Sequence, residues 1–140
     1  IEICISAHET ENENKATLLN RVAIQLAQGS FDWAFLMRST DLINQSAFED
    51  AGPFLADYDA VWGQICEPIA EQGGQLGFRV GQAKTLTDFE DLLFRNPAAT
   101  IAGGHFVRVT ALLSTPYDER LTLGESTKQA YALWRNFRCI

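Results

Sequence analysis

The spacing of apolar residues predicts two amphipathic helices near opposite ends of the chain. Across residues 15–28 the apolar side chains recur at the 3.6-residue period of a helix, and Asn12 or Asn14 can cap its start. Gly29 stands where a helix end favours a residue of positive φ. Residues 126–129 have the sequence pattern of a capping box, which predicts the start of the second helix there. The apolar face of that helix comprises Ala130, Leu133, Trp134 and Phe137.

The middle of the chain predicts a third long helix, preceded by a loop with a helical turn over residues 39–51. Pro53 suits the first turn of a helix, Pro68 would kink or break it, and residues 73–74 are glycines that close it. One arc of the helical wheel holds Phe54, Leu55, Tyr58, Val61, Trp62, Ile65, Cys66 and Ile69. A capping box at Thr87 and Glu90 opens a further short helix, which ends before Pro97.

Four segments favour strands. Residues 1–6 alternate apolar and polar side chains, and residues 31–38 place Phe31, Trp33, Phe35 and Met37 on one side, although a short helix there is an alternative. Residues 76–80 are predicted to form a short strand. Residues 100–114 are the most β-prone stretch, with glycines at 103 and 104 as a bulge or bend. A turn at residues 115–118 separates this stretch from the last helix.

The resulting order is β-α-β-α-β-α-β-α. Alternation of this kind predicts an α/β fold with a four-stranded mixed sheet in one layer, covered by about four helices. The alternating pattern of residues 1–6 is typical of a sheet with one more open face, so an α+β sandwich with antiparallel pairs is the alternative. The length of 140 residues predicts a single globular domain over residues 1–140.

The composition indicates the class of protein and its cellular compartment. Hydrophobic residues make up 46% and charged residues 21% of the chain, which predicts a packed core, and no apolar run approaches the roughly 20 residues of a membrane span. Three cysteines without a Cys-x-x-Cys pair argue against a disulfide framework or zinc site and indicate reduced thiols in the cytoplasm. The chain starts at Ile1 without Met, so an upstream segment could have been removed.

Charge is distributed unevenly. The first 78 residues sum to −9 and the remainder to +2, which gives the net charge of −7. Residues 39–78 contain no Lys or Arg. The acids of this base-free stretch are Asp41, Glu49, Asp50, Asp57, Asp59, Glu67 and Glu71. Such a segment repels the phosphates of nucleic acid and suits a basic protein partner, a metal, or solubility alone.

A few residues could carry chemistry. His8 with Glu9 and Glu11 could form an oxygen-rich metal site, but a zinc-protease signature would need histidine at position 12, which is Asn, and a solvated acidic loop is the plainer interpretation. His105 is a candidate base or ligand, or a structural histidine on a strand. Cys66 or Cys4 could pair with either histidine as a nucleophile, although Cys66 falls on the apolar arc of its predicted helix.

These observations favour a protein-interaction or assembly domain of the adaptor, chaperone or immunity type. Neither a dinucleotide-binding glycine motif nor a phosphate-binding loop occurs, so no cofactor is expected. A small metal-dependent or hydrolytic enzyme using the His/Glu cluster is the alternative, and a structural component of a larger assembly is another. If the sheet cannot cover every two-sided helix, the uncovered surface would form a homodimer or partner interface.

Overall fold

The computed structural model describes residues 13–37, 42–44, 46–63, 68–70, 76–78, 85–95, 97–102 and 104–140. The predicted first strand, residues 1–6, lies outside these residues. The elements in chain order are α1 (Lys15–Gln28), β1 (Trp33–Leu36), α2 (Ala47–Leu55), β2 (Ala60–Trp62), β3 (Pro68–Ala70), β4 (Leu76–Phe78), α3 (Phe89–Arg95), α4 (Pro97–Ala102), β5 (His105–Arg108), α5 (Val109–Ser114) and α6 (Glu125–Asn136).

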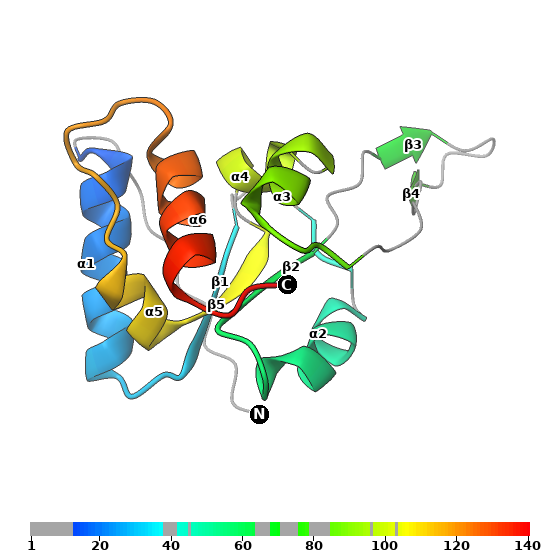
Figure 1. The fold of residues 1–140 in the computed structure, drawn as a ribbon, viewed down its shortest axis with the longest axis horizontal. Coiled ribbons are helices and arrows are strands. Elements are labelled where there is room, and N and C mark those ends of the chain that lie inside the picture. Colours follow the sequence, from blue (N-terminus) through cyan, green and yellow to red (C-terminus); the bar gives the residue numbers. More distant parts are fainter. Residues whose placement is uncertain are drawn as a thin grey trace.

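The fold is mixed α/β and is built around a three-stranded antiparallel sheet of order β1-β5-β2 (Figure 1). β5 is the central strand, and its first residue, His105, lies opposite Leu36 of β1 and Trp62 of β2. On the outer edge of β2, residues 138–140 run parallel to the strand through an Ala60–Cys139 bridge. β3 and β4 form a separate two-stranded antiparallel sheet.

Alternate residues of the three strands pack into two apolar clusters on opposite faces of the sheet. On one face Ala34, Ala60, Trp62 and Val107 pack with residues of α1, α3, α4, α5 and α6. On the other face Val61 and Phe106 pack with Ala51 of α2, and Trp33, Phe35 and Leu55 lie against them. Most helices therefore cover one face, while α2 covers the other, as Figure 1 shows.

The two terminal helices confirm the periodicity. α1 begins after Asn14, whose side chain accepts a hydrogen bond from the N–H of Ala16. Its left-handed residue is Ser30 (φ 59°) and not Gly29, which has φ of −78°. The predicted apolar face of α6 packs into the larger core cluster. α6 starts at Glu125 after Gly124, without a side-chain cap, so the capping box expected at residues 126–129 is not formed.

The long helix expected from Pro53 is wrong. α2 ends at Leu55 with Pro53 in its interior, and the chain turns and becomes the buried strand β2. Part of the apolar arc assigned to this helix belongs to β2. A strand that is buried on both faces has a continuous run of apolar residues in place of alternation, so its pattern can be mistaken for that of a helix. The backbone N–H and C=O groups of β2 are bonded on one side to β5 and on the other to residues 138–140.

The remaining differences concern short elements. The strand expected over residues 100–114 is confined to β5, because helices α4 and α5 flank it directly. The cap of α3 is formed by Asp88, which accepts from the N–H of Asp91, one residue beyond the expected Thr87–Glu90 box. On β1, Trp33 and Phe35 share a face as expected, while Phe31 packs on the other face and Met37 is exposed.

The alternating strand-helix order and the four-stranded mixed sheet are not confirmed. The described part has an antiparallel main sheet, as the α+β alternative expected. None of the helices that the structure describes is long and apolar enough to cross a membrane.

Candidate functional site

The structure describes some of the predicted binding and catalytic residues and none of the predicted metal ligands. Four acids of the base-free stretch, Glu49, Asp50, Asp57 and Asp59, lie on α2 and on the turn between α2 and β2. The buried candidate His105 begins β5. The other candidates lie outside the described residues: Asp41, Glu67, Glu71, His8, Glu9, Glu11, Cys4 and Cys66.

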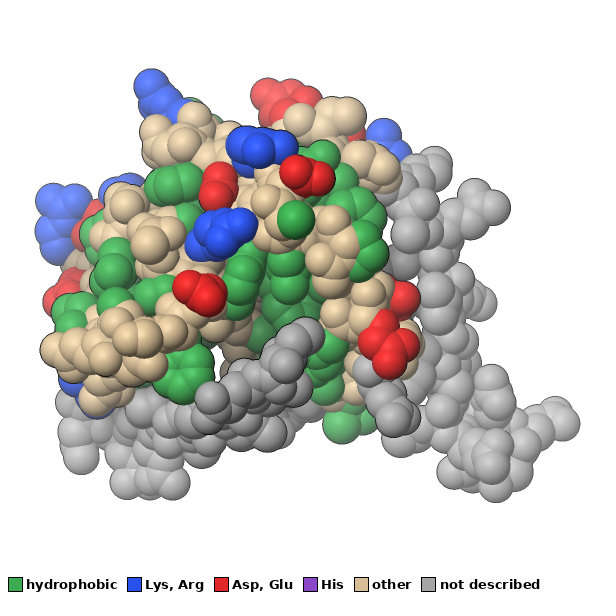
Figure 2. Space-filling model, turned by 90° about the horizontal axis from the view of Figure 1, so that it is seen from below, with side chains coloured by type: hydrophobic (Ala, Val, Ile, Leu, Met, Phe, Trp, Pro, Cys, Tyr) green, Lys and Arg blue, Asp and Glu red, His purple; other side chains and the backbone are tan. Residues whose placement is uncertain are grey.

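α2 presents exposed aromatic rings beside exposed carboxylates. Phe48 and Phe54 have 37% and 40% of their surface exposed, although both are large apolar side chains. Glu49 and Asp50 fill the first turn of α2, and Asp57 follows its end. On the face seen from below, the side on which α2 lies, hydrophobic side chains lie beside charged ones of both signs (Figure 2). We call Phe48, Glu49, Asp50, Phe54 and Asp57 together the α2 surface.

Local interactions explain why α2 forms here and why one of its rings is held in place. The hydroxyl of Ser46 donates to Asp50, and negative charge in a first turn favours the helix dipole. Ala51 is buried against the sheet. Phe48 meets Phe106 edge-on with ring centroids 5.4 Å apart, so part of its ring is anchored in the core while the rest faces solvent. The second ring, Phe54, lies 6.4 Å from Tyr58.

The carboxylates of the α2 surface lack the cationic ion-pair partners that most other described carboxylates have. Five carboxylates elsewhere in the described residues form ion pairs. Those pairs are Lys15–Glu125, Arg21–Glu13, Arg95–Asp91, Arg108–Asp59 and Arg120–Asp118. Within the same described ranges, no cationic side chain lies within ion-pair distance of Glu49, Asp50 or Asp57. No cationic side chain of the described residues therefore matches their negative charge.

Asp59 has a different role from its neighbours. One carboxylate oxygen lies 3.3 Å from Nε of Arg108, and the other accepts a hydrogen bond of 3.1 Å from the N–H of Arg138. The guanidinium of Arg108 also lies over the indole ring of Trp33, 4.6 Å from its centroid. Asp59 thus ties the turn before β2 to β5 and to residues 138–140, and its charge is already matched within the chain.

His105 is packed in the core. Only 4% of the residue is exposed, and its imidazole stacks on the indole of Trp62 with ring centroids 4.7 Å apart and planes 11° apart. Neither ring nitrogen has a hydrogen-bond partner among the residues that the structure describes, and burial lowers the pKa of His105 to about 4. The ring is consequently neutral at physiological pH and closed to solvent. Its role as a base or ligand stays a prediction.

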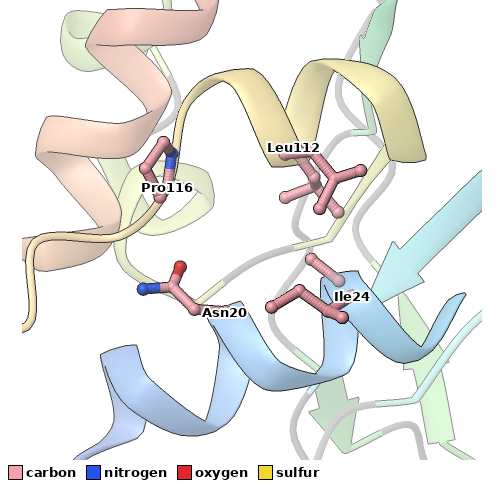
Figure 3. Close-up of a pocket in the computed structure, with 6 residues that line it drawn as sticks. Asn20, Ile24, Leu112 and Pro116 are labelled. Atoms are coloured by element: carbon pink, nitrogen blue, oxygen red, sulfur yellow. The ribbon is translucent and has the colours of Figure 1, made fainter. Parts of the chain in front are cut away.

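The pattern of the sequence did not indicate the cavity of about 140 Å³ between α1 and α5. Its lining residues are Asn20, Ala23, Ile24, Leu112, Leu113 and Pro116, shown in Figure 3. The side-chain amide of Asn20 donates to the carbonyl of Tyr117 and accepts from its N–H, so the polar atoms at this wall serve the fold. The rest of the wall is hydrocarbon, and no titratable side chain lines it.

The described part of the structure contains no cluster of side chains suited to a metal ion. Among the residues that it describes, no three His, Cys, Asp or Glu side chains gather in a way that could hold a metal ion. The predicted His8, Glu9 and Glu11 cluster lies outside that part of the chain.

Comparisons with protein-family models, with curated proteins and with solved structures found no match to this chain.

Proposed function

We propose that this chain is a protein-interaction or assembly domain that binds a basic segment of a protein partner through the α2 surface. The observation that carries the proposal is the pairing of exposed Phe48 and Phe54 with carboxylates that have no counter-charge among the described residues. This function is of the adaptor, chaperone or immunity type.

The physical chemistry of interfaces supports this combination. Aromatic rings bury large areas with few rotatable bonds, and interface hot spots are rich in them. Phe48 is already restrained by Phe106, so it loses less conformational freedom when a partner covers it. Charges around such an anchor raise the rate of encounter and select the sign of the partner.

The sign of the charge indicates the partner. The net charge of −7 and the absence of Lys and Arg from residues 39–78 oppose binding to the phosphates of nucleic acid. Lys and Arg side chains of a partner would supply the charges that Glu49, Asp50 and Asp57 lack within the described chain. Arg can also lie flat on an aromatic ring, an arrangement that this protein already uses between Arg108 and Trp33.

A peptide titration tests the electrostatic part. The probe is a fluorescein-labelled peptide of alternating Lys and Leu, with a Glu-Leu peptide as the negative control. We expect Glu49→Gln/Asp57→Asn to weaken binding by about tenfold, and added salt to weaken binding to the wild type. Asp32→Asn/Glu90→Gln changes the net charge equally at exposed positions elsewhere and should keep the affinity within about twofold.

Equal weakening by both double variants would attribute the binding to net charge alone and contradict the proposal. Salt-insensitive binding would contradict it as well. Phe54→Ala tests the aromatic anchor separately, because Phe54 lies at the exposed end of α2 and should mainly speed dissociation of the peptide. Sedimentation velocity without peptide shows whether a second copy of the chain occupies the surface instead, and a dimer that Phe54→Ala disrupts would replace the basic partner.

A further inference from the structure

Three aromatic rings in a row connect the sheet to its last helix. The imidazole of His105 stacks on Trp62, and the indole of Trp62 lies 5.5 Å from that of Trp134 on α6. His105 also lies opposite Leu36, so on the central strand β5 it lies between the last residues of β1 and β2. Any change in the charge of this imidazole therefore acts where β1, β2, β5 and α6 meet.

The buried polar atoms of this row have no hydrogen-bond partner in the described part of the chain. They are both ring nitrogens of His105 and the Nε1 atoms of Trp62 and Trp134. Buried polar atoms are almost always paired, because each loses its bonds to water on folding. The imidazole thus has no acceptor that would stabilise a second ring proton.

The charged residues on the described elements around His105 are paired with one another, exposed or on the opposite face. On α3, Asp91 is paired with Arg95 and Glu90 is exposed. β1 and β2 contain no charged residue, and Arg108 of β5 lies on the opposite face over Trp33. Glu125 and Lys128 of α6 are paired with Lys15 and Asp118.

Two further groups complete this environment. Arg135 lies exposed in the last turn of α6. Cys139 packs on the same face of the sheet as Trp62, and burial raises the pKa of its thiol to about 12, so this group stays neutral. A charge on His105 would therefore be uncompensated by these residues.

We propose that His105 is an acid-sensitive latch, in which protonation of the buried imidazole loosens α6 from the sheet. Burial holds the imidazole neutral in the closed state and makes protonation much easier once the ring reaches water. The indole face of Trp62 attracts an imidazolium and opposes release, so the loss of hydration must outweigh this attraction.

The direction of the effect follows from the two protonation states. His105 has a pKa of about 4 when closed and an ordinary value of 6.5 when exposed, so the open state binds more protons between these values. The closed state, in which α6 is packed on the sheet, is fully favoured above about pH 6.5. Between about pH 6.5 and 4, each unit of acidification should raise the ratio of open to closed molecules by up to tenfold.

Hydrogen exchange followed by NMR, from about pH 7 to about pH 4.5, tests the latch after correction for intrinsic exchange rates. We expect protection of α6 amides to fall on acidification before that of β1 amides. His105→Phe keeps an aromatic ring on Trp62 and should remove most of this pH dependence. His8→Gln removes the other histidine of the chain and should leave the pH dependence as in the wild type.

An unchanged pH dependence in His105→Phe would overturn the proposal, as would protection lost equally in all elements, which indicates global unfolding. The wild type gives a test that does not depend on the folding of the variant. In a titration of ¹⁵N-labelled histidine, the His105 ring should remain neutral in the closed state well below its ordinary pKa. A ring that titrates at the ordinary value without any change in α6 would contradict the latch.

Discussion

The N–H of Arg138 donates a hydrogen bond of 3.1 Å to the carboxylate of Asp59, and this contact holds residues 138–140 against β2. The carbonyl of Arg138 in turn accepts from the N–H of Asp59, and Ile140 exchanges backbone hydrogen bonds with Ala60 and Trp62. The edge of β2 is thereby covered by the same chain. An edge strand with open N–H and C=O groups favours pairing with other chains, so this cover also protects the sheet.

Asp59→Ala should lower the free energy of unfolding by about 1–2 kcal/mol, because it removes the acceptor for Arg138 and the ion-pair partner of Arg108. Both side chains of that ion pair are partly exposed, which keeps the loss modest. Asp57→Ala removes a neighbouring carboxylate and should change the free energy by less than about 0.5 kcal/mol. Urea unfolding compares the two, and equal losses would contradict the role given to Asp59.

Leu133→Ala should be far more destabilising than the same substitution at Leu123. Leu133 is completely buried in α6 within the larger core cluster, whereas Leu123 is 86% exposed in the loop before that helix. The buried change creates a cavity and should cost about 2–5 kcal/mol, while the exposed one should stay within about 0.5 kcal/mol. Thermal and urea unfolding give both values. A small loss for Leu133→Ala would show that α6 does not pack as described.

The helices α1 and α6 could be predicted because their information is local. Each has an apolar face that repeats at the helical period over 12 or more residues. β2 could not be predicted in the same way, because it is three residues long and buried on both faces. Its partners are β5 and residues 138–140, which lie far along the chain, so no local pattern reveals them.

In the candidate site, too, the sequence indicated local features but not contacts between residues far apart in the chain. The sequence located the acids, and the exposure of Glu49, Asp50 and Asp57 agrees with the low burial of charged side chains in general. It did not show that Asp59 is used within the fold, since Arg108 and Arg138 are distant in sequence. The exposed ring of Phe54 was missed because Phe54 fell on the apolar arc of one long predicted helix, and that of Phe48 because it fell in the loop predicted over residues 39–51.

The end of α1 provides two opposite effects at adjacent positions. Ser30 is in the left-handed region with φ of 59°, which costs a residue with a side chain roughly 1–2 kcal/mol. Ser30→Gly removes this cost but adds freedom to the unfolded chain, so we expect a net gain of up to about 1 kcal/mol.

Gly29→Ala should destabilise, because a Cβ there would lie 2.8 Å from the Phe31 ring, which packs against the core. A loss of about 1–3 kcal/mol is expected for such overpacking. Urea unfolding of Ser30→Gly and Gly29→Ala measures both changes in the free energy of unfolding. A stabilised Gly29→Ala protein would show that the ring of Phe31 moves freely.

Acid should weaken the fold through Asp118 at lower pH than through His105. The carboxylate of Asp118 accepts hydrogen bonds from the Arg120 guanidinium at 2.8 and 2.9 Å and from Lys128 at 2.6 Å. These cations hold the pKa of Asp118 far below its usual 3.8. Because the folded state prefers the ionised form, this contribution to stability is present above about pH 3.8 and is lost as the pH falls below it.

Asp118→Asn should therefore lower the melting temperature at neutral pH and reduce the further loss between about pH 4 and pH 2.5. The loss between about pH 6.5 and 4 should remain, since it belongs to His105. Glu119→Gln is the matched control at the next residue and should retain both acid-dependent losses. Melting temperatures measured across the two pH ranges separate the contributions. An Asp118→Asn protein with the wild-type loss below pH 4 would assign that loss to other carboxylates, because the substituted side chain can no longer bind a proton.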